Sequence, residues 1–442
     1  MSNKINELIV FLVVFISRLP FIWNSPGIDP DNWLVLRIGK EISDSGSYKA
    51  SRLPGYPISE YLASFFGGSA WWVLNMVTVF FTAFCCVVFY KILEHYNVKT
   101  KTLIAISLGF VQSIFISSTT NMDYNWSLFF LLLGLFSLLK RKLLIAGFAI
   151  GLMIGIRFTN IIFLFPILYF LHYNVKIRSL KSIVQFYAVA LLAFGLVFIP
   201  VFNKYSLNIF PDVGNDSIDV KSIVSQATLY VYGVLGLLGL LVAVIYLLFF
   251  KTESFKKLNQ NKEIVVFSGL MIMITSLLYI KYPFESYYNI PSVPFVLLIL
   301  AMLIHHQKVK VFVLMCFIGS PFFIYVSSNK IQLKGAIFVN EKMEDDYSNY
   351  VQSVHATFSN IKTEKRVLIT AGFYNCYIYK YQNKNKNVKI LGIPTLELLK
   401  YYISKGYKVY YPKGIEKEVE IFNNYNISEY GEGILEPLNF DR

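Results

Sequence analysis

Long apolar runs recur along this chain, and they constrain its fold more than any other feature. A helix of roughly 20 apolar residues crosses the hydrocarbon core of a bilayer. The chain is 55% hydrophobic and only 15% charged, which is typical of proteins whose solvent is lipid. The runs predict a polytopic α-helical membrane protein with about eleven transmembrane helices, at residues 5–23, 70–93, 102–120, 126–139, 143–156, 158–173, 182–202, 224–250, 263–280, 288–305 and 309–327.

The positive charges of the chain indicate its orientation in the membrane. Its formal net charge is +14, and the Lys and Arg residues of the short loops between the apolar runs gather in every second loop. Such loops stay in the cytoplasm, so the pattern predicts a cytoplasmic N-terminus and no nucleic-acid partner. No cleavage site of small residues follows the first run, which predicts a retained span. We therefore expect an integral protein of a bacterial cell membrane, in contact with membrane lipid.

The polar end of the chain predicts a second domain. Residues 1–327 hold the apolar runs, whereas residues 328–442 are polar enough to fold in water. Three short stretches of β-branched and aromatic residues, at 366–372, 387–393 and 407–412, predict buried strands, and 375–382 and 395–404 have helical spacing. An odd number of crossings places this small α/β domain outside the cytoplasm.

Two carboxylates stand at the start of the first outside loop, residues 24–69. Asp29 and Asp31 follow the first apolar run and therefore lie near the membrane surface. Such a pair can serve as a general base toward a hydroxyl, or can hold a divalent cation such as Mg²⁺ or Mn²⁺. The alternative is structural, since an Asp in front of an amphipathic helix is a common N-cap.

The same loop ends in a segment fixed by Pro54, Gly55 and Pro57. Arg52 lies within it and can bind a phosphate through two parallel hydrogen bonds. Tyr48 and Tyr56 flank the arginine and can stack on a sugar ring. The alternative is a pair of interfacial helices anchored by an aromatic belt, which accounts for the tyrosines only.

Three segments together resemble the GT-C superfamily of membrane glycosyltransferases, in particular the protein mannosyltransferase and aminoarabinose transferase group. They are Asp29-Pro-Asp31 followed by an amphipathic helix and the SRLPGYP segment at 51–57, the glycine-rich GLMIGIRFTNIIFLFP at 151–166, and PFESYYNIPSVP at 283–294. Their order and predicted sidedness match that superfamily over about the first three quarters of the chain.

The resemblance implies transfer of a sugar from a polyprenyl-phosphate donor to a glycan, lipid or protein acceptor outside the cytoplasm, with inversion. It implies that Asp29 or Asp31 takes the proton of the acceptor hydroxyl, and that cations stabilise the departing phosphate. No cofactor is required, although a divalent cation on the two aspartates is compatible with this chemistry.

The late outside loop departs from the family pattern. Many members carry an Arg beside the Tyr there, whereas this chain has Glu285 and then Ser, Tyr, Tyr288 and Asn. Glu285 and Tyr288 are expected to contact substrate, and Arg157 or Lys281 would replace the missing cation.

Two further charged residues have two interpretations each. Asp123, in an outside turn, caps the following helix or adds a third acid, and the cap is the favoured reading. Arg18, near the outer end of the first run, reaches the headgroups or pairs with a loop carboxylate.

Two other functions compete with glycosyl transfer. A transporter or flippase of lipid-linked glycans would need broken helices and mid-membrane charges, and a non-enzymatic scaffold would need neither. Convergence of Asp29, Asp31, Arg52 and Lys281 around one outward-facing cavity would favour an enzyme, and their dispersal would favour a scaffold.

Overall fold

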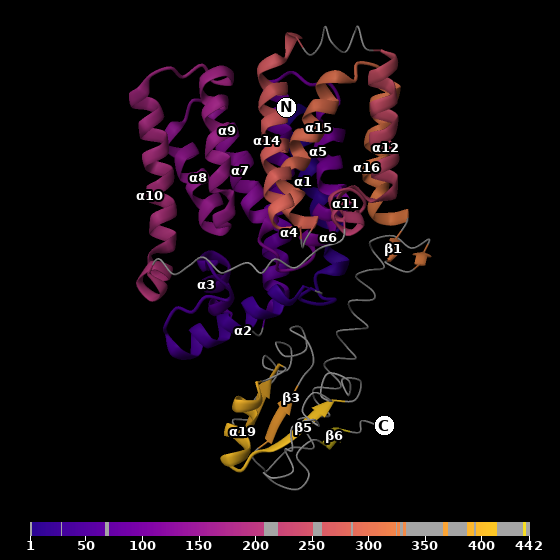
Figure 1. Cartoon of the computed structure of the whole chain (residues 1–442). Helices are drawn as coiled ribbons and strands as arrows, with labels where there is room; N and C mark the ends of the chain where they lie inside the picture. Colours follow the sequence, from indigo (N-terminus) through magenta and orange to yellow (C-terminus); the bar gives the residue numbers. More distant parts are fainter. Residues whose placement is uncertain are drawn as a thin grey trace.

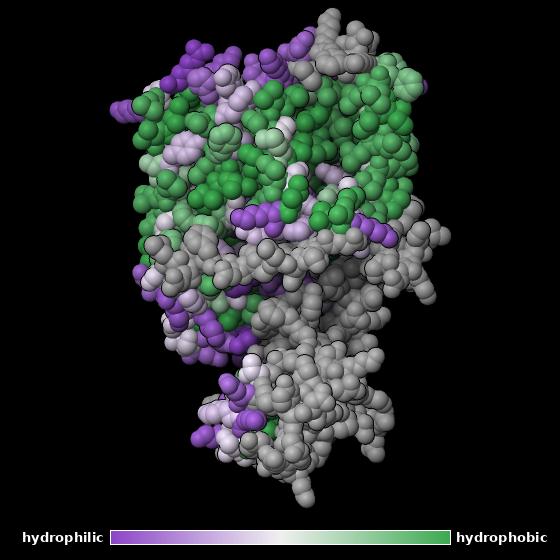
Figure 2. All heavy atoms as spheres, in the orientation of Figure 1, coloured by the Kyte–Doolittle hydropathy of each residue, from purple (hydrophilic) through white to green (hydrophobic). Residues whose placement is uncertain are grey.

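The computed structural model describes residues 2–27, 29–66, 70–206, 220–250, 259–283 and 286–323 of the apolar part. In the polar part it describes 325–327, 330–332, 366–369, 387–392, 395–412 and 436–438. The chain is a helical membrane protein (Figure 1). On the face seen in Figure 2, a hydrophobic band crosses the bundle between two hydrophilic ends, as a bilayer requires.

Five helices in the described part of the chain are long and apolar enough to cross a bilayer by themselves. They are α4 (Trp71–His95), α10 (Leu180–Tyr205), α12 (Leu229–Phe249), α14 (Lys262–Lys281), and the continuous helix made of η4 (Ser286–Ser292) and α15 (Val293–Leu303).

The other apolar runs form shorter or broken helices. These are α1 (Ser2–Ile16), α5 (Lys101–Phe110), α6 (Gln112–Ser118), α7 (Tyr124–Leu139), α8 (Leu143–Ile156), η2 (Phe158–Phe163), α9 (Leu164–Tyr169), η3 (Phe170–Asn174) and α16 (Gln307–Phe323). The run at 102–120, expected as one span, bends by 64° between α5 and α6. A second break lies inside α12, where Gly233 has a φ of 69° that a residue with a side chain rarely adopts.

Arg18 stabilises the bend between α5 and α6. Its guanidinium is fully buried against the rings of Phe110 and Phe115, and it donates to the carbonyl oxygens of Val14 and Gly109 and to the hydroxyl of Ser118. The carbonyls at the end of a helix lack helical donors and carry partial negative charge, so a cation is favourable there. The sequence had suggested that Arg18 reaches the headgroups or pairs with a loop carboxylate, and both interpretations were wrong.

Two short amphipathic helices lie across the end of the bundle that is opposite the N-terminus (Figure 1). Helix α2 (Pro30–Ser45) begins at the N-cap Asp29 and ends at Gly46, whose left-handed backbone returns its N–H to the Ile42 carbonyl. Helix α3 (Pro57–Phe65) crosses it closely because Gly39 of α2 has no side chain where it meets Ala63. Between them lies a cis Leu53–Pro54 peptide.

The chain that leads into α2, with its first turn, is attached to the bundle by hydrogen bonds from two asparagines. Asn75 of α4 donates to the carbonyls of Ile22 and Ser25, at 2.9 Å each, and Asn121 donates to the carbonyl of Asn32 at 3.1 Å. These bonds fix the start of α2, and therefore the two aspartates, against the bundle.

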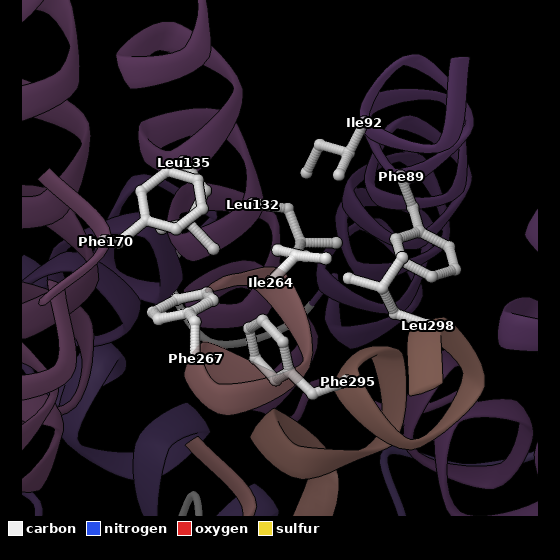
Figure 3. Close-up of a pocket in the computed structure, with 9 residues that line it drawn as sticks. All are labelled: Phe89, Ile92, Leu132, Leu135, Phe170, Ile264, Phe267, Phe295 and Leu298. Carbon is white, nitrogen blue, oxygen red and sulfur yellow. The ribbon is translucent and has the colours of Figure 1, made fainter. Parts of the chain in front are cut away.

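A small cavity in the bundle is lined only by apolar side chains of α4, α7, η3, α14 and α15 (Figure 3). The lining residues are Phe89, Ile92, Leu132, Leu135, Phe170, Ile264, Phe267, Phe295 and Leu298. Several of them belong to the ends of α4 and α14 that are remote from α2 and α3. A cavity without polar groups offers nothing to orient a reacting substrate.

The polar end of the chain contains a parallel sheet of order β4-β3-β5-β6. Its strands are β3 (Arg366–Ile369), β4 (Val388–Leu391), β5 (Lys408–Pro412) and β6 (Glu436–Leu438), and α19 (Leu396–Ser404) connects β4 to β5. The three predicted strands and the helix at 395–404 are confirmed, with Thr395 as the N-cap of α19. The helix predicted at 375–382 lies outside the described residues. A separate hairpin pairs β1 (Tyr325–Ser327) with β2 (Lys330–Gln332).

Close packing between α8 and α10 depends on three glycines of α8. Gly147, Gly151 and Gly155 recur every fourth residue and face α10, and a Cβ at Gly151 would touch the carbonyl oxygen of Ala190 and lie 2.6 Å from the Ala193 Cβ. Small residues at this spacing let two helices approach closely in a membrane.

We therefore expect Gly151→Ala to destabilise the bundle by about 1–3 kcal/mol through overpacking. Gly195→Ala on α10 is the matched control, because no atom lies within 4 Å of its added Cβ. Thermal unfolding in detergent measures both, and equal melting temperatures would contradict the packing argument.

Candidate functional site

Asp29 holds the first turn of α2. One of its carboxylate oxygens accepts the backbone N–H of Asp31 at 2.8 Å, and Pro30 at the first helical position needs no such partner. The residue is 9% exposed. The structural interpretation of Asp29, an N-cap, is therefore confirmed.

Asp31 pairs with the arginine of the proline-fixed segment. Its carboxylate lies 2.8 Å from the Arg52 guanidinium, and both side chains keep about a quarter of their surface exposed, 24% and 23%. Burial raises the pKa of Asp31 to about 6; Arg52 and Arg157 lower it, whereas Asp29 and Asp123 raise it. A carboxyl that titrates near neutrality is suited to exchange a proton with a substrate.

Arg52 stays charged in this setting. Burial alone lowers the pKa of Arg52, but Tyr56, Asp31 and Asp123 raise it above the ordinary arginine value. The guanidinium also lies 4.1 Å from the centre of the Tyr56 ring, a favourable cation–π contact.

A second and deeper ion pair joins α8 to the start of α7. Arg157, at the end of α8, lies 2.6 Å from the carboxylate of Asp123, and the two side chains are only 4% and 7% exposed. The other oxygen of Asp123 accepts the hydroxyl of Ser59 in α3 at 3.0 Å. Asp123 precedes α7 but makes no side-chain cap, so it is the third acid and the favoured prediction of a cap was wrong.

Tyrosines surround the Arg157 guanidinium. Its central carbon is 3.5 Å from the ring centre of Tyr124 and 5.5 Å from those of Tyr56 and Tyr288. Tyr56 thus lies near both arginines, and Tyr288 brings the late loop, as η4, to the same place. This arrangement joins the segment around Arg52 and Tyr56 to the segments at 151–166 and 283–294.

The site therefore gathers three aspartates and two arginines, and their formal charges sum to −1. Two of the aspartates are already paired with arginines. An arginine that pairs with an aspartate can bind an anion such as phosphate if the anion replaces the carboxylate as its partner.

Two of the predicted site residues lie apart from this cluster or outside the described residues. Lys281 is exposed at the end of α14, and its ammonium lies 5.5 Å from the centre of the Tyr282 ring, whereas the Arg157 guanidinium lies against Tyr124 and Tyr288. Three of the four residues named for the convergence test, Asp29, Asp31 and Arg52, thus lie together. The test also required an outward-facing cavity around them, and the cavity described above lies elsewhere in the bundle. Arg157, the alternative cation, takes part, whereas Glu285 lies outside the described residues.

Tyr48 supports the loop rather than offering a stacking face. It is buried, and its hydroxyl donates to Glu60 at 2.6 Å. Glu60, Ser59 and Tyr124 did not stand out in the sequence. For Glu60 the available signal was an acid within the apolar helix PISEYLASF, where a carboxylate needs buried donors.

A divalent cation held by Asp29 and Asp31 stays a prediction. In the part of the chain that the structure describes, no group of three His, Cys, Asp or Glu residues could hold a metal ion. One oxygen of Asp29 already accepts a backbone N–H, and one of Asp31 pairs with Arg52. Cationic partners for an anion are instead supplied by the arginines.

No protein-family model, no curated protein and no solved structure matches the chain. Its function must therefore be argued from the site itself.

The raised pKa of Asp31 predicts how stability depends on pH. The carboxyl titrates near 3.9 when unfolded and at about 6 when folded, so the folded state binds more protons between these values. The free energy of unfolding consequently falls as pH rises through this window. Asp31→Asn lacks the titration, so its melting temperature relative to wild type should be higher at pH 7.5 than at pH 4.5. A difference that is constant, or of opposite sign, would contradict the pKa.

The buried pair predicts strong coupling between Arg157 and Asp123. Asp123→Asn or Arg157→Gln alone should cost about 3–5 kcal/mol, because each leaves a buried charge without its partner. The double variant should cost clearly less than the sum of the two. Denaturation of the four proteins in detergent gives the coupling, and additive losses would show that the pair contributes no mutual stabilisation.

Proposed function

We propose that this protein is a membrane glycosyltransferase that moves a sugar from a polyprenyl-phosphate donor to an acceptor outside the cytoplasm. The observation that carries the proposal is the meeting of Asp31 with Arg52 and Arg157, because glycosyl transfer from a phosphate needs a base and a cationic anion site together. Resemblance to the GT-C superfamily at 29–31, 51–57, 151–166 and 283–294 agrees with it.

The proposed topology has eleven crossings with a cytoplasmic N-terminus. The crossings are α1, α4, the bent pair of α5 and α6, α7, α8, the segment from η2 to η3, α10, α12, α14, η4 with α15, and α16. The loop with α2 and α3 then lies outside, and so does the proposed α/β domain with its parallel sheet. Sugars carried on a polyprenyl phosphate reach such a site through the outer leaflet.

The two aspartates have different proposed roles. Asp31 is the general base, since it is partly exposed and its pKa of about 6 lies near neutrality. Asp29 is more deeply buried and its carboxylate already closes the first turn of α2. It therefore orients Asp31 and keeps negative charge beside it.

The proposed reaction is a single displacement. The acceptor oxygen forms a bond to the anomeric carbon from the face opposite the phosphate, and Asp31 takes the hydroxyl proton. The bond between the anomeric carbon and the phosphate oxygen breaks, and its electron pair leaves with the polyprenyl phosphate. Arg52 and Arg157 stabilise the growing phosphate charge. The configuration at the anomeric carbon inverts.

Transport of lipid-linked glycans is the second candidate, favoured by the two broken helices. The bend between α5 and α6 and the break at Gly233 resemble the discontinuous helices that line transporter sites. Flux of a labelled polyprenyl-phosphate sugar across proteoliposomes, without any new glycan product, would support this candidate instead.

The proposal predicts that Asp31→Asn lowers transfer by about 10²–10⁴-fold, the usual effect of losing a general base. Asp29→Asn should mainly cost stability, about 1 kcal/mol, as for other N-caps. Mass spectrometry of envelope glycans and lipids, from cells with and without the protein, names the sugar and the acceptor and quantifies the product.

Glu41→Gln is the matched control for this assay. Glu41 is also a carboxylate of α2, but it pairs with Arg37 and Lys49. Wild-type product levels in Asp31→Asn, with Glu41→Gln also normal, would remove Asp31 as the base, and no product from wild type would remove the function.

A further inference from the structure

Glu60 is a buried carboxylate that the proposed reaction does not use. It lies in the first turn of α3 with no exposed surface. One oxygen accepts the backbone N–H of Ser51 at 2.5 Å, and the other accepts the Tyr48 hydroxyl at 2.6 Å and the Tyr56 N–H at 3.2 Å. Hydrogen bonds to an ionised acceptor are among the stronger ones in proteins.

These three donors all belong to the segment that carries Arg52. Ser51 immediately precedes the arginine, and Tyr56 follows it and supplies the ring beneath its guanidinium. Between them the chain turns at Gly55, whose φ of 103° suits only glycine and whose N–H donates to the Arg52 carbonyl at 2.8 Å. The Glu60 carboxylate thus accepts a hydrogen bond from a residue on each side of the turn.

The neighbouring residue extends this control to the second arginine. Ser59 donates to Asp123, which pairs with Arg157. One turn of α3 therefore contacts the supports of both cations and sets the distance between them. A phosphate held by two guanidinium groups depends on that distance, because misplacement by about 1 Å can cost a large part of the rate.

We propose that Glu60 is a positioning residue that holds Arg52 toward Asp31 and Arg157, and so shapes the binding site for the donor phosphate. Glu60 is not a second base, since its oxygens already accept three hydrogen bonds and it has no exposed surface. The identity of the anion rests on the proposed function, whereas the positioning of Arg52 does not.

The test measures the arginine itself. Phenylglyoxal modifies guanidinium groups, and mass spectrometry resolves the modification rate at Arg52 from that at Arg37 in the same molecule. Glu60→Gln keeps the side-chain volume but turns one acceptor toward its donors as an N–H. Losing one charge-assisted hydrogen bond shifts an equilibrium by about tenfold, so we expect the Arg52 rate to rise about tenfold while the Arg37 rate is unchanged.

Undecaprenyl phosphate, a polyprenyl phosphate without the sugar, is the anion probe. In the wild type it should slow modification of Arg52 but not of Arg37, and in Glu60→Gln this protection should be weaker. Absence of protection in wild type would count against the donor site of the proposed function. The positioning role of Glu60 would still be tested by the modification rates measured without the probe.

Two variants keep the inference falsifiable. Tyr48→Phe removes only one of the three donors and should give a smaller rise at Arg52, and it replaces Glu60→Gln if that variant does not fold. Glu41→Gln, which removes a carboxylate on α2 that pairs with Arg37, should leave the Arg52 rate unchanged. An unchanged Arg52 rate in both Glu60→Gln and Tyr48→Phe would overturn the proposal, as would equal acceleration at Arg52 and Arg37.

Discussion

The buried ion pair between Arg157 and Asp123 is the interaction on which the end of the bundle beside α2 and α3 depends. A charge without a partner is costly where water is excluded, so the ends of α7 and α8 must meet for either residue to be tolerated. Asp123 also accepts the hydroxyl of Ser59, and this bond sets α3 over the pair. Tyr56 at the N-cap of α3, Tyr124 of α7 and Tyr288 of η4 then surround the guanidinium.

Two other buried cations among the described residues donate hydrogen bonds to backbone carbonyls. Arg18 is held by the end of α5 at the bend, and Lys310 donates to the Ala301 carbonyl near the end of α15. Carbonyls at helix ends offer partial negative charge without the cost of burying a carboxylate. Among the described residues, the pairs of Asp31 with Arg52 and of Asp123 with Arg157 lie at one place, at the end of the bundle beside α2 and α3, where they form the candidate site.

The balance of charge in that cluster bears on how it would accept an anion. Three carboxylates face two arginines, so a phosphate entering the cluster would add to a net negative charge. Asp31 relieves this charge as the reaction proceeds, because it takes the proton of the acceptor hydroxyl and its pKa of about 6 lies near neutrality. A base that becomes protonated as the reaction proceeds, beside a phosphate that becomes more negative as it leaves, is consistent with the proposed displacement.

The sequence by itself determined that the chain is a helical membrane protein. Apolar runs of this length are most stable in lipid, and there the backbone must satisfy its own hydrogen bonds as a helix. The sequence also located Asp29, Asp31, Arg52 and Tyr56, since caps, prolines and glycines act locally, and it predicted three strands of the parallel sheet from their β-branched residues. Only the tertiary structure decided that Asp123 pairs with Arg157, that Glu60 holds the Arg52 segment, and that Arg18 holds the helix bend. These partners lie up to about a hundred residues apart in the chain. Which distant polar groups meet depends on helix packing and on the need to satisfy every buried charge, and local patterns carry neither.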